Sequence, residues 1–549
     1  MALELLHPGV YVQEIPSGVR PIQGVSTSTA AFIGVTDKGP LPSTFLPTGR
    51  VAQPVLVTSF TDYTRQFGGF RRDSFLTYAV KAFYDNGGRR VYIVRVANGA
   101  TVATFGPGSP PLSPPGGTLP ISAANEGAWG NNIWIAVTAS SDRNAANFKL
   151  IVMYGATATE ASRNIVETYD NVTVMSSTPG APVPANYVGA LVNGRSEYIA
   201  FPPATPLTTL PAPFAPRHLS GGSDGAAVTA TGFTGAPSVD GVRTGTGLRA
   251  LDKLIDVNLI AIPGQGDVTT INSGMAYCKN IRQLQDCFYI GDIGSVTSVD
   301  AARLDNAATN VLRVSDARDF ATVGFPAGTQ LDKSAGDYGA IYYPWVKTND
   351  PLGTGNNPRI LVPPSGYVAG IYARTDNSRG VFKAPAGIET GLAGAIAPAT
   401  TVSDLEQDSL NPIQVNVIRS VPGSGLVIWG TRTIGSDAEY RYVPVRRMAI
   451  FLRVSIYYGI QFAVFEPNDE PLWASLRLNI RAFMLTQFRS GAFQGSKPDD
   501  AFFVKCDSST TTQTDIDNGV VNILVGFAPL KPAEFVVLKL TQKVNQQPQ

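Results

Sequence analysis

The 549-residue sequence carries little charge and contains no long hydrophobic run. Charged side chains make up 15% of the chain, and the formal net charge is +1 at pH 7. A protein that binds nucleic acid through the phosphates is usually strongly basic, so direct nucleic-acid binding is disfavoured. No stretch of about 18 apolar residues occurs and no secretory signal begins the sequence, so we expect neither membrane insertion nor export by a signal peptide.

Residues that bind metals or act as nucleophiles are equally scarce. The sequence contains three cysteines, whose odd number and wide spacing argue against a disulfide framework and fit a reducing compartment. They are Cys278, Cys287 and Cys506. The only histidines are His7 and His218. A structural zinc site needs four nitrogen or sulfur ligands with local spacing, which this chain cannot easily supply. We therefore predict no metal and no cofactor.

Glycine and proline, in contrast, are abundant. The 55 glycines and 41 prolines indicate a loop-rich, β-rich protein, and the length predicts three or four domains. Buried-type strands alternate with helical stretches on both sides of a strand-rich region, which predicts a mixed sheet covered by helices and interrupted by a β-rich insertion. The predicted fold class is multidomain α+β or α/β. The predicted domains are an α/β domain at 26–105 and 246–365, an inserted β-rich domain at 106–245 and a C-terminal domain at 366–530.

The C-terminal domain is expected to contain two helices, at about 445–464 and 471–489, and an unusual number of arginines. Pro471 suits the first turn of a helix that begins after Asn468 or Asp469. Residues 441–490 hold seven arginines and only three acidic residues. Three of these arginines lie on the second helix: Arg477, Arg481 and Arg489. The arginines form either a solvated face with internal ion pairs or a docking face for an acidic partner.

Both ends of the sequence contain a strand-like segment next to a proline-marked hinge. These segments, PGVYVQEI at 8–15 and EFVVLKLT at 534–541, are rich in β-branched and aromatic residues. Each could pair within the chain or add a strand to a neighbour's sheet, which would satisfy its backbone N–H and C=O groups. We predict terminal arms at 1–25 and 531–549. Their inter-subunit strand residues are Val10, Tyr11, Val12, Gln13, Glu14 and Ile15, and Phe535, Val536, Val537, Leu538, Lys539 and Leu540.

One motif could indicate catalysis. The segment GGSDG at 221–225 matches the G-x-S-x-G pattern of a hydrolase elbow, with Ser223 as nucleophile and His218 as the available base. That elbow requires a strand before it and a helix after it, whereas both flanks here are loop-like, so a glycine-rich turn is the favoured interpretation. Asp292 follows a strand where an α/β sheet could bind a ligand. Nothing assembles a nucleophile, a base and an orienting group, so we predict that the protein is not an enzyme.

Several longer segments carry a more specific signal. The first part of the sequence contains HPGVYVQEIPSGVRPIQGVSTSTAAFIGVTDKGP, AVKAFYDNGGRRVYIVRV, WGNNIWIAV and HLSGGSDG. The last part contains VIWGTRTIGSDAEYRYVPVRRMAIFLRVSI, AVFEPND and GFAPLKPAEFVVLKLTQ. In this order the segments resemble the contractile tail sheath protein family, found in myophage tails, R-type pyocins and extracellular contractile injection systems. The resemblance covers both ends and most of the middle of the chain.

The resemblance implies a structural subunit of a helical assembly. Six subunits would form each ring, and the rings would stack around an inner tube between baseplate and terminal cap proteins. The arms would complete the sheets of neighbouring subunits, the insertion would face outward, and the arginine-bearing helix would face the tube. Contraction would drive the tube through a target cell envelope. The protein would be made in the bacterial cytoplasm and become part of a virion tail or of an extracellular or intracellular contractile particle.

Two other functions compete with this interpretation. A passive self-assembling lattice or tube protein would share the strand exchange but would have no contracted state. A serine hydrolase would use Ser223, and its activity would be lost in a Ser223→Ala variant.

Overall fold

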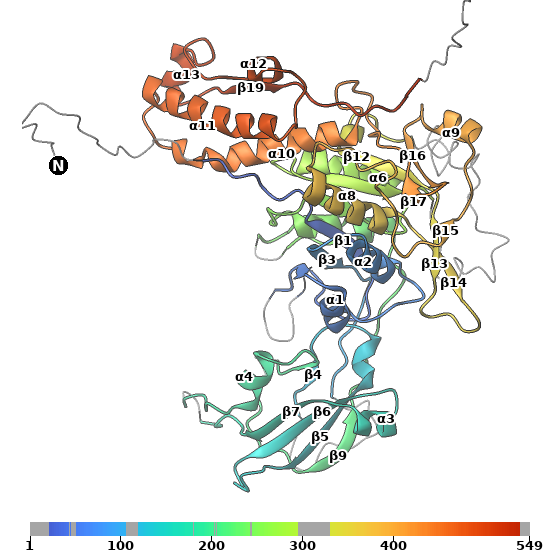
Figure 1. The fold of residues 1–549 in the computed structure, drawn as a ribbon. Coiled ribbons are helices and arrows are strands. Elements are labelled where there is room, and N and C mark those ends of the chain that lie inside the picture. The colour runs from blue at the N-terminus through green and yellow to red at the C-terminus, as the bar shows by residue number, and fades with distance from the viewer. Residues whose placement is uncertain are drawn as a thin grey trace, which may run out of the picture. The chain divides into compact units, whose positions relative to one another are not determined.

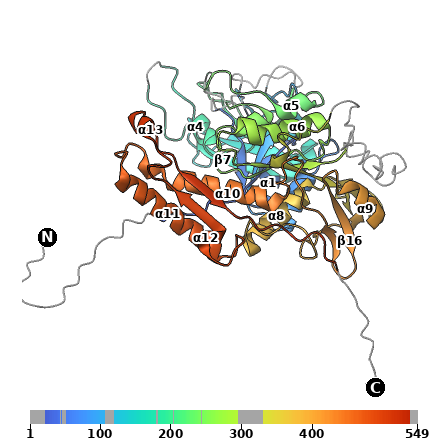
Figure 2. The ribbon, with the colours of Figure 1, turned by 90° about the horizontal axis from the view of Figure 1, so that it is seen from above.

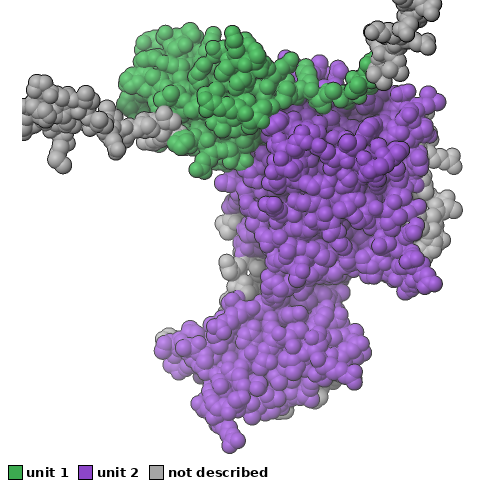
Figure 3. Space-filling model, in the orientation of Figure 1, with its two compact units in different colours: residues 1–25, 448–549 green, residues 26–447 purple. Residues whose placement is uncertain are grey.

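The computed structural model of the protein describes residues 21–42, 44, 51–105, 119–178, 181–202, 204, 206–241, 244–294 and 330–537. Its contacts divide the chain into two compact units, which Figure 3 distinguishes by colour. Unit 1 comprises Met1–Val25 and Met448–Gln549, and unit 2 comprises Ser26–Arg447. The described residues nearest to both ends of the chain therefore belong to the same compact unit.

Unit 2 is built around an eight-stranded mixed sheet (Figure 1). Its six central strands run parallel, in the spatial order β16 (Val415–Val421), β12 (Gly339–Tyr343), β11 (Phe288–Asp292), β10 (Leu259–Ala261), β1 (Ala30–Gly34) and β3 (Val91–Arg95). The edge strands β17 (Gly425–Ile428) and β2 (Val55–Val57) are antiparallel to their neighbours. This confirms the predicted mixed sheet. The central strands are buried on both faces, which explains why they appear in the sequence as continuous apolar runs.

Helices cover both faces of this sheet, as the sequence predicted. The main ones are α2 (Leu76–Asp85), α6 (Val268–Ala276) and α8 (Ser365–Arg379). Helices α2 and α8 share one hydrophobic core with Phe32 and Phe288 of the sheet. They can lie close together because α8 has a glycine at the contact: a Cβ at Gly366 would stand 2.5 Å from the carbonyl oxygen of Ala79. Helix α6 packs on the opposite face, against the ring of Tyr289.

The remaining elements of this part of unit 2 are short. They are α1 (Phe60–Phe67), α5 (Ala230–Thr234), α9 (Asp404–Leu410) and a sheet of β14 (Arg359–Val362), β13 (Val346–Asn349) and β15 (Ala397–Pro398). We expected the C-terminal domain to begin at 366. Because α8 covers the main sheet and β16 and β17 extend it, the compact C-terminal unit begins at Met448 instead.

The β-rich insertion forms a second sheet with its own hydrophobic core. Four antiparallel strands lie in the order β7 (Ile165–Val172), β6 (Phe148–Tyr154), β5 (Ile133–Ala139) and β9 (Phe214–His218). Further elements are the pair β4 (Ser122–Ala123) and β8 (Ile199–Ala200), and the helices α3 (Ala158–Arg163) and α4 (Val188–Asn193). The core of the insertion contains Trp129, Ile135, Leu150 and Phe201 and shares no residue with the core of the main sheet.

Unit 1 consists of a helical hairpin and a small sheet. Its elements are the greater part of α10 (Val443–Gly459), α11 (Glu470–Arg489), α12 (Pro498–Ala501), β18 (Phe502–Lys505), α13 (Gln513–Asp517) and β19 (Leu524–Phe527). Helices α10 and α11 lie side by side (Figure 2), and the rings of Phe451 and Phe483 are 6.0 Å apart. The start of α11 follows the sequence signals, because the Asp469 side chain accepts a hydrogen bond from the backbone N–H of Leu472 and Pro471 occupies the first turn.

Candidate functional site

The described parts of the two termini both belong to unit 1. At the N-terminal side, the backbone N–H of Val25 donates to Ser455 Oγ of α10 at 3.1 Å. Gly24 faces the ring of Phe451, and a Cβ at Gly459 would stand 2.6 Å from Ile22. This close contact between segment 21–25 and α10 fixes the point from which the N-terminal arm leaves. The arm strand at 8–15 lies outside the described residues.

The C-terminal segment is apolar and exposed. The side chains of Phe535, Val536 and Val537 are 75%, 88% and 78% exposed. Residues 531–537 form no strand in the single chain. The expected strand residues Leu538, Lys539 and Leu540 lie outside the described residues. A sequence with high β-propensity that is exposed and unpaired is suited to pairing with another chain.

Strands β18 and β19 form the nearest sheet to this segment along the chain. They pair in antiparallel register, with Phe502 opposite Phe527 and Lys505 opposite Leu524. Within the described ranges no third strand joins this sheet. A two-stranded sheet is marginally stable by itself, and its outer edges present backbone N–H and C=O groups that an added strand could pair with. Here α11 and the ring of Phe493 support one face.

The three arginines proposed to face a tube differ in their surroundings. Arg477 donates to the backbone carbonyl of Cys506 and to Glu470. Arg481 pairs with Asp499 at 2.8 Å, and its side chain is 52% exposed. Arg489 is exposed at the end of α11, and no ion pair involves it among the residues that the structure describes. Arg481 and Arg489 are therefore accessible, whereas Arg477 also holds the loop after β18.

Other arginines of this region are internal. Arg446 pairs with Asp337, and both side chains are buried. Arg447 donates to Asp376 at 2.9 Å, and this pair is buried as well. The two interpretations of the arginines thus apply to different residues. The buried ion pairs of Arg446 and Arg447 stabilise unit 2. The accessible arginines of α11 are the candidates for docking to an acidic partner.

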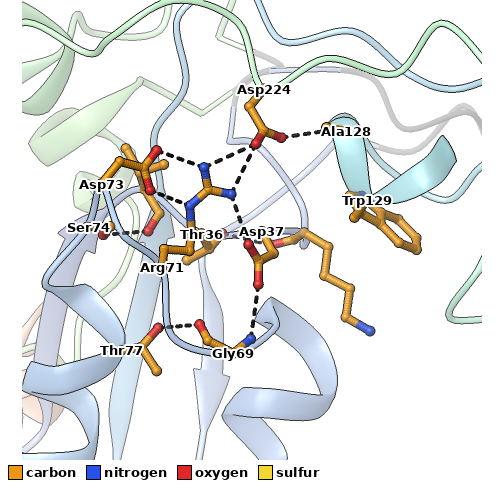
Figure 4. Close-up of polar contacts among 12 residues, drawn as sticks. Thr36, Asp37, Gly69, Arg71, Asp73, Ser74, Thr77, Ala128, Trp129 and Asp224 are labelled. Atoms are coloured by element: carbon orange, nitrogen blue, oxygen red, sulfur yellow. Dashed lines mark hydrogen bonds and ion pairs between the residues drawn. The ribbon is translucent and has the colours of Figure 1, made fainter. Parts of the chain in front are cut away.

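A further polar cluster connects the insertion with the main sheet domain (Figure 4). The guanidinium of Arg71 donates to Asp73 at 2.7 Å, to Asp37 at 2.9 Å and to Asp224 at 3.1 Å. Asp224, on the segment that returns from the insertion, also accepts from the backbone N–H of Ala128 at 2.8 Å. Burial disfavours the charge of Arg71, but hydrogen bonding and the charges of the aspartates outweigh burial and raise its pKa. We did not predict this cluster because its members are far apart in sequence.

The GGSDG segment belongs to the same connection. Residues 98–104 and 220–226 run beside each other and are joined by backbone bridges, among them Thr101 with Ser223. The Ser223 hydroxyl accepts a hydrogen bond from the N–H of Gly225 at 3.1 Å. His218 ends β9, with its ring 5.0 Å from that of Trp134. Helix α5 starts only at Ala230, so the strand–turn–helix geometry of a nucleophile elbow is not formed here.

Asp292 joins two elements of the main sheet domain. At the end of β11 its carboxylate accepts hydrogen bonds from the N–H of Gly264 at 3.1 Å and from Ser365 at the start of α8. Burial raises the pKa of Asp292 to about 6, although these hydrogen bonds act in the opposite direction. Asp292 therefore links the C-terminal end of β11 to the N-terminal end of α8.

Metal-binding clusters and membrane-spanning helices are both absent from the described residues. In the ranges given above, no group of three or more histidine, cysteine, aspartate or glutamate side chains is arranged to hold a metal ion. None of the described helices is both long enough and apolar enough to span a bilayer.

Comparison with known proteins identifies the family. The model of the phage tail sheath protein central domain matches residues 241–434, and that of the phage tail sheath C-terminal domain matches residues 435–543. The tail sheath protein of Burkholderia phage BcepMu is 26% identical over 507 residues, which cover 90% of this chain and 89% of the relative. The tail sheath protein of Vibrio phage KVP40 is 27% identical over 186 residues, 33% of this chain and 27% of the relative.

Solved structures share the fold. The PVC sheath complex of an extracellular contractile injection system in its contracted state gives a TM-score of 0.52 at 21% identity, covering 99% of both chains. The sheath tail protein of Listeria innocua gives a TM-score of 0.56 at 14% identity, covering 93% of this chain and 96% of that one. The fold is thus that of sheath proteins. Since the two family models together span more than half of the sequence, the chain belongs to the phage tail sheath protein family.

Proposed function

We propose that the chain is the structural subunit of a contractile tail sheath. Subunits assemble as stacked hexameric rings around an inner tube, and the sheath contracts to drive the tube through a target cell envelope. The partners are further copies of the chain, the inner tube protein, and baseplate and terminal cap proteins. Membership of the tail sheath family supports this proposal, as does the fold shared with contracted sheath complexes.

One observation carries the proposal: an exposed apolar segment and an incomplete sheet occur in the same unit. Residues Phe535, Val536 and Val537 have strand-forming side chains but form no strand in the single chain. Among the described residues, no further strand pairs with β18 or β19. Adding the arms of neighbouring copies, 8–15 and 534–541, to this sheet satisfies both, because strand addition pairs the backbone groups of arm and edge.

Strand exchange at both ends of every chain produces a mesh. Each subunit donates two arms and accepts arms from its neighbours, so subunits stay connected while the compact units rotate and move outward. The free energy of the stroke is stored in the extended lattice and released when the interfaces repack, so no nucleotide and no catalytic residue is required. The chain acts as a structural protein and not as an enzyme.

The tube-facing role falls to α11. Arg481 and Arg489 are exposed on this helix and face an acidic surface of the inner tube. Arg477 contributes mainly by holding the loop at Cys506. Attraction between exposed charges is screened within about 10 Å at ordinary salt, so such contacts break readily when the lattice expands.

The test is assembly of the chain expressed alone, imaged by negative-stain electron microscopy. We expect hollow helical tubes from the full chain and monomers from a variant lacking residues 1–17. As a matched pair, Val12→Pro removes a backbone donor from the arm, whereas Val12→Thr keeps the donor and the β-branched shape. The proline variant should block assembly and the threonine variant should not.

Two outcomes would contradict the proposal. Monomers from the full chain would show that the arms pair within the chain. Tubes that have the same diameter and helical rise with and without a co-expressed inner tube would indicate a passive lattice that lacks a contracted state.

A further inference from the structure

The turn between α10 and α11 presents a fully exposed aromatic side chain. Phe465 is 103% exposed, and its neighbour Val464 is 56% exposed. The backbone of Phe465 has a φ of +70°, in the left-handed region that residues other than glycine rarely adopt. Such a conformation is unfavourable in isolation and is retained at functional sites when the surrounding structure imposes it. The turn therefore presents an apolar side chain that is available for contact with another molecule.

The turn is held rigidly from both sides. Phe462 and Ala463, just before it, pack into a small core with Trp473. Just after it, the Asn468 amide donates to the carbonyl of Val520 at 3.0 Å and accepts from Trp473 Nε1 at 2.9 Å. Phe465 is therefore presented in a fixed position, which lowers the entropic cost of using it as an anchor in an interface.

The outer face of the two-stranded β18–β19 sheet is an exposed apolar patch with one cation. Directly opposed residues of antiparallel strands share a face, so Phe503 and Gly526 lie on the same face as Lys505 and Leu524. Phe503 is 46% exposed and Leu524 is 53% exposed. A Cβ at Gly526 would stand 2.2 Å from the Phe503 ring, so the glycine lets this ring lie across β19. The result is a shallow apolar surface beside the Lys505 ammonium.

The turn at Phe465 and the outer face of the β18–β19 sheet are complementary in polarity and charge. Glu466 is exposed next to Phe465, and Lys505 is exposed next to Phe503. Neither Glu466 nor Lys505 forms an ion pair in the part of the chain that the structure describes. We propose that Phe465 of one copy packs on Phe503 and Leu524 of a second copy while Glu466 pairs with Lys505.

This contact has the symmetry that an extended assembly needs. It joins two different surfaces of the chain, the turn at Phe465 and the outer face of the β18–β19 sheet. Every copy can therefore use its turn on one neighbour and its sheet face on another, so the contact repeats into rings or helices. Arm exchange uses the edges of the β18–β19 sheet, whereas this docking uses its face, so both contacts can form together. The inference rests on the proposed assembly of the chain into a sheath.

A photo-reactive phenylalanine analogue at position 465 tests the contact directly. Full-length protein carrying it is assembled, irradiated, digested and analysed by mass spectrometry. We expect adducts on 502–505 or 524–527, formed only between chains. Mixing isotope-labelled and unlabelled protein distinguishes these from adducts within one chain. Adducts confined to other segments, or to a co-expressed inner tube protein, would overturn the proposal.

Variants measure the contribution of the contact. Phe465→Ala should raise the protein concentration needed for assembly at least tenfold, since a central aromatic anchor is lost. Ile388→Ala truncates an apolar side chain that is 64% exposed in unit 2 and should change that concentration less than twofold. Glu466→Lys and Lys505→Glu should each impair assembly, and the double variant should restore it.

The outcomes separate the two proposals. A wild-type chain that stays monomeric at high concentration would overturn both the sheath assembly and this contact. A wild-type chain that assembles, together with a Phe465→Ala variant that assembles equally well, would overturn the contact alone. Failure of the double charge exchange to restore assembly would refute the Glu466–Lys505 pairing.

Discussion

Asp292 accepts two hydrogen bonds from Ser365, one from the backbone N–H and one from the hydroxyl, both at 2.8 Å. The pair joins the end of β11 to the first residue of α8, and both residues are buried. A carboxylate at a helix N-terminus is stabilised by the unpaired N–H groups there, yet burial raises the pKa of Asp292 to about 6. Because burial favours the neutral carboxyl and the hydrogen bonds favour the carboxylate, the contact between Asp292 and Ser365 should depend on pH.

The first prediction concerns stability between pH 4 and pH 7. The raised pKa means that Asp292 keeps its proton in the folded chain at a pH where the unfolded chain, near 3.8, has lost it. Its contribution is therefore complete below about pH 4 and is lost as the pH rises through about 6. A shift of about two units corresponds to roughly 3 kcal/mol. We compare the free energy of unfolding of the wild type with that of Asp292→Asn. The difference, wild type minus variant, should fall by up to this amount as the pH rises from 4 to 7.

Urea denaturation of both proteins at several pH values checks this. The asparagine variant cannot titrate at this position, so it cancels the contributions of the other carboxylates. Parallel stability curves for the two proteins would mean that the pKa of Asp292 is the same in the folded and unfolded chains.

The second prediction concerns the connection of the insertion. Arg71 has a side chain 12% exposed and bonds to three aspartates, whereas Arg65 is 56% exposed and pairs with Glu197 of the insertion. Arg71→Ala leaves three carboxylates without their cation. It should lower the free energy needed to separate segments 98–104 and 220–226 by about 2–3 kcal/mol. Arg65→Ala should change it by less than about 0.5 kcal/mol, because exposed ion pairs contribute little.

Hydrogen exchange of amides in 98–104 and 220–226 is the measurement. Exchange should be at least tenfold faster in Arg71→Ala and almost unchanged in Arg65→Ala. Equal protection in the Arg71→Ala protein would show that the backbone bridges alone hold the connection.

The third prediction separates docking arginines from structural ones. Arg489→Gln should weaken binding of the assembled sheath to the inner tube at low salt while leaving the stability of the chain within about 0.5 kcal/mol of wild type. Arg477→Gln should lower the stability of unit 1, because Arg477 donates to the Cys506 carbonyl. Co-sedimentation and thermal unfolding give the two readouts. The control Arg379→Gln removes another exposed arginine, in unit 2, and should affect neither.

The fourth prediction distinguishes two ways in which the C-terminal arm could pair. Neighbouring residues of a strand direct their N–H groups to opposite edges, so Val536→Pro and Val537→Pro remove donors from opposite sides. If the arm is inserted between two strands, both variants should abolish tube formation. If it is added at an outer edge, one of them should be tolerated. Tubes from both variants would show that this arm does not pair through residues 536–537.

Local signals in the sequence were sufficient for much of the fold. The strand expected before Asp292 is present as β11, and Asp469 with Pro471 predicted the start of α11. The preceding helix was expected to reach 464, but α10 ends at Gly459, and 461–463 form a 3₁₀ turn. A continuous apolar pattern does not show where a helix ends before such a turn.

Long-range pairs were not accessible from sequence patterns. The partners of Arg446 and Arg71 include Asp337 and Asp224, which are more than a hundred positions away. A count of charges in a window of the sequence therefore overestimated how many arginines are free to dock. The exposure of Phe465 was also missed, because an apolar residue in an apolar run is expected to be buried, and its φ depends on the folded turn.

The packing of segment 21–25 on α10 has a mechanical consequence. The described parts of both arms, 21–25 and 531–537, belong to unit 1. Tension applied through the two arms therefore enters and leaves through unit 1, where Gly24 and Gly459 seat the incoming chain against α10. The described residues of the parallel sheet of unit 2 belong to neither arm. In the proposed strand-exchanged lattice, pulling on the arms would therefore load unit 1 first.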